Sequence, residues 1–94
     1  VRSSAKNHAT EISGIINLLD SSPDGTSHIY YLPSIACSVA INDKVTVTIE
    51  GKQSYATNLV QPSRTAPMTL ECDKDKKKEI LFERKEGKIL ISGR

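Results

Sequence analysis

The sequence predicts a mainly β fold, a small six-stranded antiparallel β-sandwich with one disulfide and a partly helical N-terminal extension. Strand-like segments recur about every ten residues between short turns, which is typical of small sandwiches and barrels. Only four of the 94 residues are aromatic, so Ile, Val and Leu must build the core, and Ile and Val favour strands. A chain this short buries a thin core, which a disulfide often stabilises.

The N-terminal extension, residues 1–32, is expected to contain a helix at about residues 10–20. Apolar side chains there follow the i, i+3, i+4, i+7 spacing of one helix face. These are Ile12, Ile15, Ile16 and Leu19. Thr10 can cap the helix, and the turn formers of residues 20–25, with a proline among them, end it. We expect its apolar face to pack on the sheet.

From His28 onward the chain is predicted to form strands, the first of them "HIYYL", still within the extension. Six more strands are expected within residues 33–94, the predicted sandwich domain. Their segments are "SIACSVAI", "KVTVTIE", "QSYATNLV", "APMTLECD", "KEILFERK" and "KILISG". In "KVTVTIE", residues 44–50, apolar and polar residues alternate, so one face is predicted to be buried and the other to face water.

The two cysteines, Cys37 and Cys72, are too far apart for the paired spacing of a zinc site or a thioredoxin-type redox motif. A disulfide is the simplest interpretation, and two unrelated buried thiols in a cytosolic protein are the alternative. Closing a loop of about 35 residues would stabilise the fold by roughly 3 to 4 kcal/mol. Because disulfides form in oxidising compartments, we expect the mature form of a secreted protein.

Charge and motifs point away from several function classes. The net charge of +2 comes from 13 basic and 11 acidic residues, which does not indicate a nucleic acid partner. No apolar run approaches the roughly 20 residues that cross a bilayer. The only histidines, His8 and His28, have no catalytic pattern around them. We therefore expect no enzyme, no cofactor, no bound metal and no membrane association.

One family shares the order of these features. Cys37 lies early in the first strand after residue 33, "KVTVTIEGKQSYAT" would form strands two and three, Cys72 precedes strand five, and "ILFERKEGKILISG" would form the closing hairpin. This arrangement resembles the MAX effectors, the ToxB-like and avirulence-protein family that plant-pathogenic fungi secrete. The resemblance covers residues 33–94, and residues 1–32 have no counterpart in the minimal family fold.

The resemblance implies a non-enzymatic effector with two three-stranded sheets and a disulfide from strand one to the connection between strands four and five. It also implies delivery into a host cell and binding of a host protein, for which a heavy-metal-associated domain is one candidate. The family binds partners through an exposed edge strand or the side chains of a sheet. Here the candidate edge is "KVTVTIE", and its expected contact residues are Lys44, Thr46, Thr48 and Glu50.

A second interpretation stays open. A bacterial periplasmic immunity or inhibitor protein, or the receptor-binding subunit of a toxin, would also combine a disulfide with a small β fold. Composition does not separate these classes. In either case we expect a monomer that binds another protein.

Overall fold

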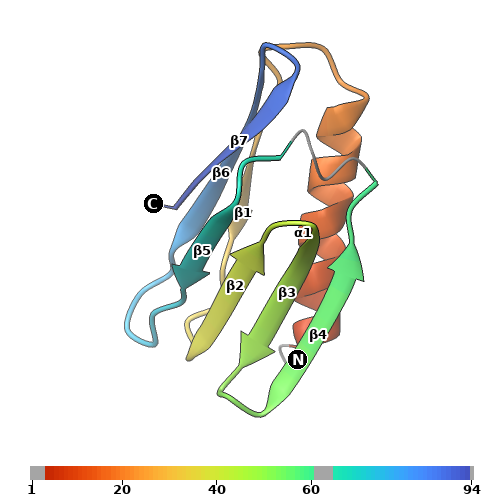
Figure 1. The fold of residues 1–94 in the computed structure, drawn as a ribbon. Helices are drawn as coiled ribbons and strands as arrows, with labels where there is room; N and C mark the ends of the chain where they lie inside the picture. Colours follow the sequence, from red (N-terminus) through yellow and green to blue (C-terminus); the bar gives the residue numbers. More distant parts are fainter. Residues whose placement is uncertain (1–3, 61–64, 94) are drawn as a thin grey trace.

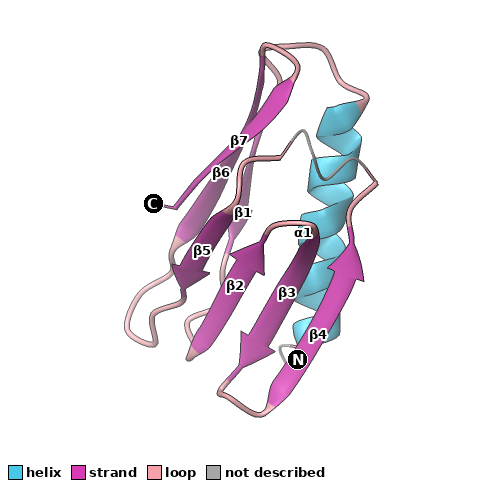
Figure 2. Ribbon diagram, in the orientation of Figure 1, coloured by secondary structure: helices cyan, strands magenta, loops and turns pink. Residues whose placement is uncertain are grey.

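The computed structural model describes residues 4–60 and 65–93, and it consists of one helix and seven strands (Figure 1 and Figure 2). The bounds of these elements are α1 Ala5–Asp20, β1 Ser27–Tyr31, β2 Cys37–Ile41, β3 Lys44–Ile49, β4 Gln53–Asn58, β5 Met68–Glu71, β6 Glu79–Lys85 and β7 Lys88–Gly93. The prediction of a mainly β fold with one helix near the N-terminus is confirmed.

The strands form two antiparallel sheets. Sheet A has the order β1-β6-β7, and sheet B has the order β4-β3-β2-β5. The two sheets meet where β5 lies beside β7. Leu70 of β5 packs so closely on Gly93 of β7 that a Cβ atom added at Gly93 would lie only 2.8 Å from the Leu70 side chain. Thr65 and Ile89 also form a parallel bridge near the other end of β7. Among the described strands, β1 and β4 therefore lie at the open edges of the molecule.

All six predicted strands from Cys37 onward are present, but the sheets divide them four and two. The resemblance implied two three-stranded sheets, and this division is wrong because β5 pairs with β2 in sheet B. The strand β1, from the N-terminal extension, pairs with β6 along its whole length and completes sheet A. The extension therefore supplies a strand as well as a helix.

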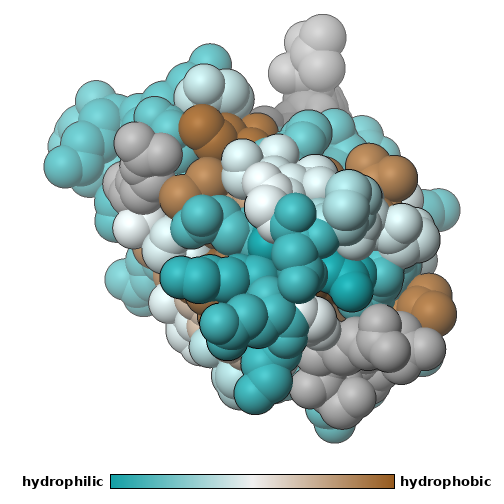
Figure 3. Space-filling model, turned by 90° about the horizontal axis from the view of Figure 1, so that it is seen from above, coloured by the Kyte–Doolittle hydropathy of each residue, from teal (hydrophilic) through white to brown (hydrophobic). Residues whose placement is uncertain are grey.

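The core lies between the sheets and α1, which runs along one side of both sheets (Figure 1). Its largest fully buried side chains come from the helix and from both sheets, and they form one cluster. They include Ile12, Ile16, Leu19, Leu32, Val39, Ile41, Val45, Val47, Ile80, Phe82 and Ile89. Seen from above, hydrophobic residues at the surface form small groups separated by more hydrophilic ones (Figure 3). Residues on both sides of the predicted boundary between 32 and 33 belong to this one core.

The helix begins earlier than the sequence predicted. Ser4 is its N-cap, and the Ser4 side chain accepts a hydrogen bond of 3.3 Å from the Asn7 N–H, so the proposed cap at Thr10 is wrong. Ala5 and Ala9 are fully buried, and they continue the apolar face toward the N-terminus at the i, i+4 spacing. The sequence pattern relied on large apolar side chains, so it did not include these two alanines and placed the start of the helix too late.

Candidate partner-binding face

The disulfide joins two paired strands at one end of sheet B. Cys37 begins β2 and Cys72 follows β5, and the two Cα atoms lie 5.0 Å apart. The Cys72 N–H also donates a hydrogen bond of 2.8 Å to the Cys37 carbonyl. The predicted bond between Cys37 and Cys72 is confirmed. It fixes the start of β2 to the start of the connection that leads from β5 to sheet A.

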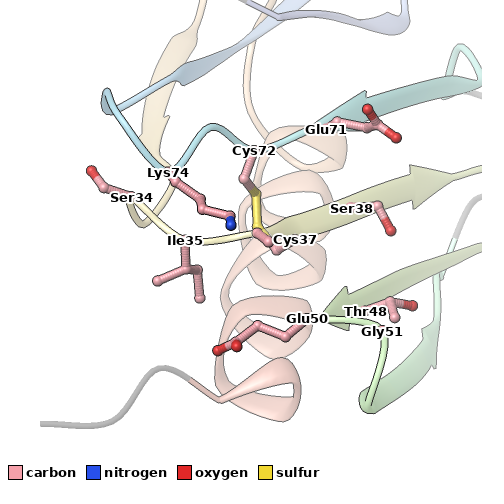
Figure 4. A pocket seen from close by; sticks show the side chains of 11 residues that line it. Ser34, Ile35, Cys37, Ser38, Thr48, Glu50, Gly51, Glu71, Cys72 and Lys74 are labelled. Atoms are coloured by element: carbon pink, nitrogen blue, oxygen red, sulfur yellow. A yellow bond between two sulfur atoms is a disulfide. The ribbon is translucent and has the colours of Figure 1, made fainter.

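A shallow groove of about 680 Å³ lies around this disulfide. Residues 34–38, the end of β3 with its turn, and the segment that follows β5 form its walls (Figure 4). Lys74 points toward the disulfide, whereas the carboxylates of Glu50 and Glu71 point away from it (Figure 4). The residues that line the groove thus include the apolar Ile35, hydroxyl side chains, two carboxylates and one cation.

The structure places β3 in the interior of sheet B, so the prediction of an edge at residues 44–50 is wrong. β3 pairs with β2 on one side and with β4 on the other. The Glu50 N–H donates to the Ala36 carbonyl and the Asn42 N–H to the Lys44 carbonyl. In an antiparallel ladder the hydrogen bonds alternate. The backbone groups of Thr46 and Thr48 are therefore already bonded to β2.

The sequence did contain a signal for this position. Asn42-Asp43 and Gly51-Lys52 are short turn pairs on either side of "KVTVTIE", and a strand between two tight turns normally has a neighbour on each side. Glu50 and Gly51 adopt positive φ angles of 53° and 68°, the conformation of the two central residues of a type I′ turn. This turn brings β4 back beside β3.

The side chains of β3 alternate as predicted. Val45, Val47 and Ile49 are buried, and Thr46 and Thr48 are half-buried on the opposite side of the sheet. Lys44 and Glu50 are exposed at the two ends of this strand. The four predicted contact residues therefore belong to the outer face of sheet B, although they do not lie at its edge.

Small side chains from the neighbouring strands continue this outer face. Directly opposed residues share a face in an antiparallel pair, and Thr48 is opposite Ser38 and Ser54, with a hydrogen bond of 3.3 Å from the Thr48 hydroxyl to the Ser54 hydroxyl. The next row is formed in the same way by the neighbours of Thr46. We call the following set the Thr face: Ser38, Ala40, Thr46, Thr48, Ser54, Ala56 and Thr69.

The open edge beside the Thr face is β4. The Leu59 N–H donates to the Asp43 carbonyl, in register with the β3–β4 ladder, so the odd-numbered residues of β4 bond to β3. The N–H and C=O groups of Ser54, Ala56 and Asn58 consequently point away from the sheet. β4 contains no charged residue and no proline, the usual protections of an edge strand. Our reasoning from the sequence missed these three residues.

Other classes of site have no support in residues 4–60 and 65–93. No group of three or more His, Cys, Asp or Glu side chains in these ranges could hold a metal ion. The helix of this part of the chain is too short and too polar to cross a membrane. No family model, curated protein or solved structure matches the sequence or the fold.

Proposed function

We propose that this protein is a secreted, non-enzymatic effector that binds a host protein, and that the partner adds a strand to β4. The observation that carries this proposal is the open, uncharged edge of β4 beside the Thr face. Unpaired N–H and C=O groups at a sheet edge can bond to an added strand, and the neighbouring side chains then select the partner.

The composition of the Thr face favours contact with another protein. Its hydroxyl and methyl groups are small, so a partner can approach the sheet closely. The charged residues of the outer face, Lys44, Glu50 and Glu71, lie at the margins of this set, so its centre can be covered without desolvating a charge. Twelve of the 16 residues in the segment 73–88 are charged, so a partner bound there would need matched charges along most of its length. The groove at the disulfide adjoins Thr48 and Ser38, so a part of the partner that extends from β4 across the Thr face would also meet this groove.

The class of partner rests on the resemblance to MAX effectors. That resemblance supports a host plant protein, and a heavy-metal-associated domain is one candidate. The disulfide is consistent with secretion and with transfer into a host cell. A periplasmic inhibitor would share these properties, so capture from plant extract and from bacterial periplasm, side by side, separates the two functions.

Replacing Ala56 by Pro tests the mode of binding once a partner has been captured. This change removes an N–H group that points away from the sheet and leaves the hydrogen bonds to β3 in place. We expect the dissociation constant of the complex to rise by at least about tenfold. Ala56→Ser keeps the N–H group and serves as the control, with binding close to that of the wild type.

Chemical-shift mapping of the same complex shows which residues contact the partner, and it can contradict binding at β4. We expect the largest perturbations at Ser54, Ala56 and Asn58 and, across the sheet, at Thr46 and Thr48. Perturbations concentrated on residues 74–78, together with loss of binding at high salt, would instead indicate an electrostatic partner such as nucleic acid.

A further inference from the structure

The second open edge, β1, has its backbone groups arranged for pairing. The Leu32 N–H donates to the Lys78 carbonyl at 2.9 Å, and the Arg84 N–H donates to the Thr26 carbonyl at 2.8 Å. Both pairs are in register with the β1–β6 ladder, so the even-numbered residues bond to β6. The N–H and C=O groups of Ser27, Ile29 and Tyr31 therefore point away from sheet A.

The same three residues place their side chains on the outer face of sheet A. Tyr31 is 59% exposed and Ile29 is 37% exposed, and Ile29 lies opposite the half-buried Leu81 of β6. The strand β1 has no charged residue and no proline. An apolar edge without such residues is a template for another strand.

We infer that β1 pairs with β1 of a second copy of this chain, antiparallel and centred on Ile29. In this register Ile29 lies opposite Ile29, and Ser27 lies opposite Tyr31. The three outward N–H groups of each copy then meet the three outward C=O groups of the other. The pairing joins the two copies of sheet A into one continuous sheet around a two-fold axis.

The side chains in this register are complementary to themselves. The large Tyr31 side chain is opposite the small Ser27, and a row of Leu81, Ile29, Ile29 and Leu81 crosses the joined sheet. No like charges face each other across the axis, which would weaken the pair. His28, on the inner side of β1, is exposed, so α1 does not cover the edge at this position.

The other open edge is less suited to a second copy. Pairing of β4 with itself around Ala56 would satisfy the outward groups of Ser54 and Asn58 in the same way, but on the Thr face it would bring together only small side chains and bury little apolar surface there. Dimerisation through β1 leaves β4 open on each copy for the proposed partner. The monomer that the sequence led us to expect is then the dissociated form at low concentration.

Sedimentation equilibrium over about a hundredfold range of protein concentration tests this dimer by mass action. We expect the average mass to approach that of two chains at the upper end of the range. Ile29→Lys places two like charges at the axis, and we expect it to raise the dimer dissociation constant by at least about tenfold. The control is Leu90→Lys, which adds the same charge on the outer face of sheet A, at a residue 42% exposed but away from the β1 edge.

Hydrogen exchange of the unmodified chain gives a test that does not depend on a folded variant. In the dimer, exchange at the amides of Ser27, Ile29 and Tyr31 slows as the concentration rises, while exchange at Ser54 and Ala56 does not change. A single-chain mass at every concentration would overturn the inference, and so would concentration-dependent protection at β4 in place of β1.

Discussion

At the scale of single residues, the Tyr30 hydroxyl links sheet A to the helix. It donates to Glu11 Oε1 at 3.2 Å and lies 2.6 Å from His8 Nδ1. One hydroxyl hydrogen cannot serve both partners, so the His8 ring donates its Nδ1–H to the Tyr30 oxygen. Burial, and secondarily the negative charge of Glu11, raises the pKa of Tyr30 above its ordinary value of 10.0.

Replacing Tyr30 by Phe should lower the free energy of unfolding by about 0.5–1.5 kcal/mol, because His8 and Glu11 lose their partner. Tyr31→Phe is the matched control, since Tyr31 is exposed and has no side-chain hydrogen bond among the described residues. Urea denaturation at neutral pH measures both variants. Equal stabilities for the two would show that the link contributes nothing.

The raised pKa of Tyr30 also has a consequence for alkaline stability. The folded protein keeps the phenolic proton to a higher pH than the unfolded chain does, so the stability that this proton supports is lost as the pH rises above 10.0. The loss of stability above this pH should be smaller for Tyr30→Phe than for the wild type.

Arg84 is the second residue that holds the helix to sheet A. Its Nη1 group donates to the Leu19 carbonyl at 2.9 Å and to the Asp20 carbonyl, where the last carbonyls of a helix lack internal partners. Its Nε group bonds to Asp24 Oδ1 at 3.2 Å. The Gly87 N–H, and secondarily Arg84, holds the pKa of Asp24 below its ordinary value.

Replacing Arg84 by Met keeps the aliphatic part of the side chain and removes these hydrogen bonds. We expect the free energy of unfolding to fall by about 1–3 kcal/mol, because the Leu19 and Asp20 carbonyls are partly buried. Lys85→Met is the control on the adjacent, exposed position. Thermal unfolding of the two variants compares them, and a larger loss for Lys85→Met would contradict this role of Arg84.

At the scale of elements, the sequence predicted what depends on local pattern. The alternation in "KVTVTIE" identified the buried and exposed sides of β3, and the turn residues separated the strands correctly. The position of each strand in its sheet depends instead on pairing between distant segments, such as β2 with β5 and β1 with β6. Periodicity within a strand is the same at the edge and in the centre of a sheet, so it does not distinguish β3 from β4, the strand that occupies the edge.

The helix provides a test of how much its buried face contributes. Ile12 is fully buried, whereas Leu18 on the same helix is 62% exposed. We expect Ile12→Ala to lower the free energy of unfolding by about 2–5 kcal/mol, because a cavity would remain in the core. Leu18→Ala is the matched control and should change stability by less than about 0.5 kcal/mol. Similar losses of stability in the two variants would indicate that each substitution weakens the helix itself, and that burial of Ile12 in the core contributes nothing further.

At the scale of the whole molecule, the helix, both sheets and the disulfide depend on one another. The radius of gyration of 12.6 Å is close to the roughly 12 Å of a single compact domain of this length. The disulfide holds β2 to β5, the contact of β5 with β7 joins the sheets, and α1 fills the space that the sheets alone would leave open. Residues 1–32 therefore contribute to the same hydrophobic core as residues 33–94.

Because the core is shared, removal of residues 1–32 tests the predicted domain boundary. A chain of residues 33–94 lacks the buried Ile12, Ile16, Leu19 and Leu32, and β6 and β7 lose the strand that completes sheet A. Each of these side chains contributes roughly 1.5–3 kcal/mol when fully buried, and their sum is comparable to the whole stability of a small domain. The disulfide would still restrict the unfolded chain, but it cannot replace the apolar surface that the missing residues bury.

We expect the truncated chain to show no cooperative thermal unfolding and little dispersion of amide resonances. A cooperative transition with dispersed resonances would show that residues 33–94 form an independent domain on which the extension is only packed.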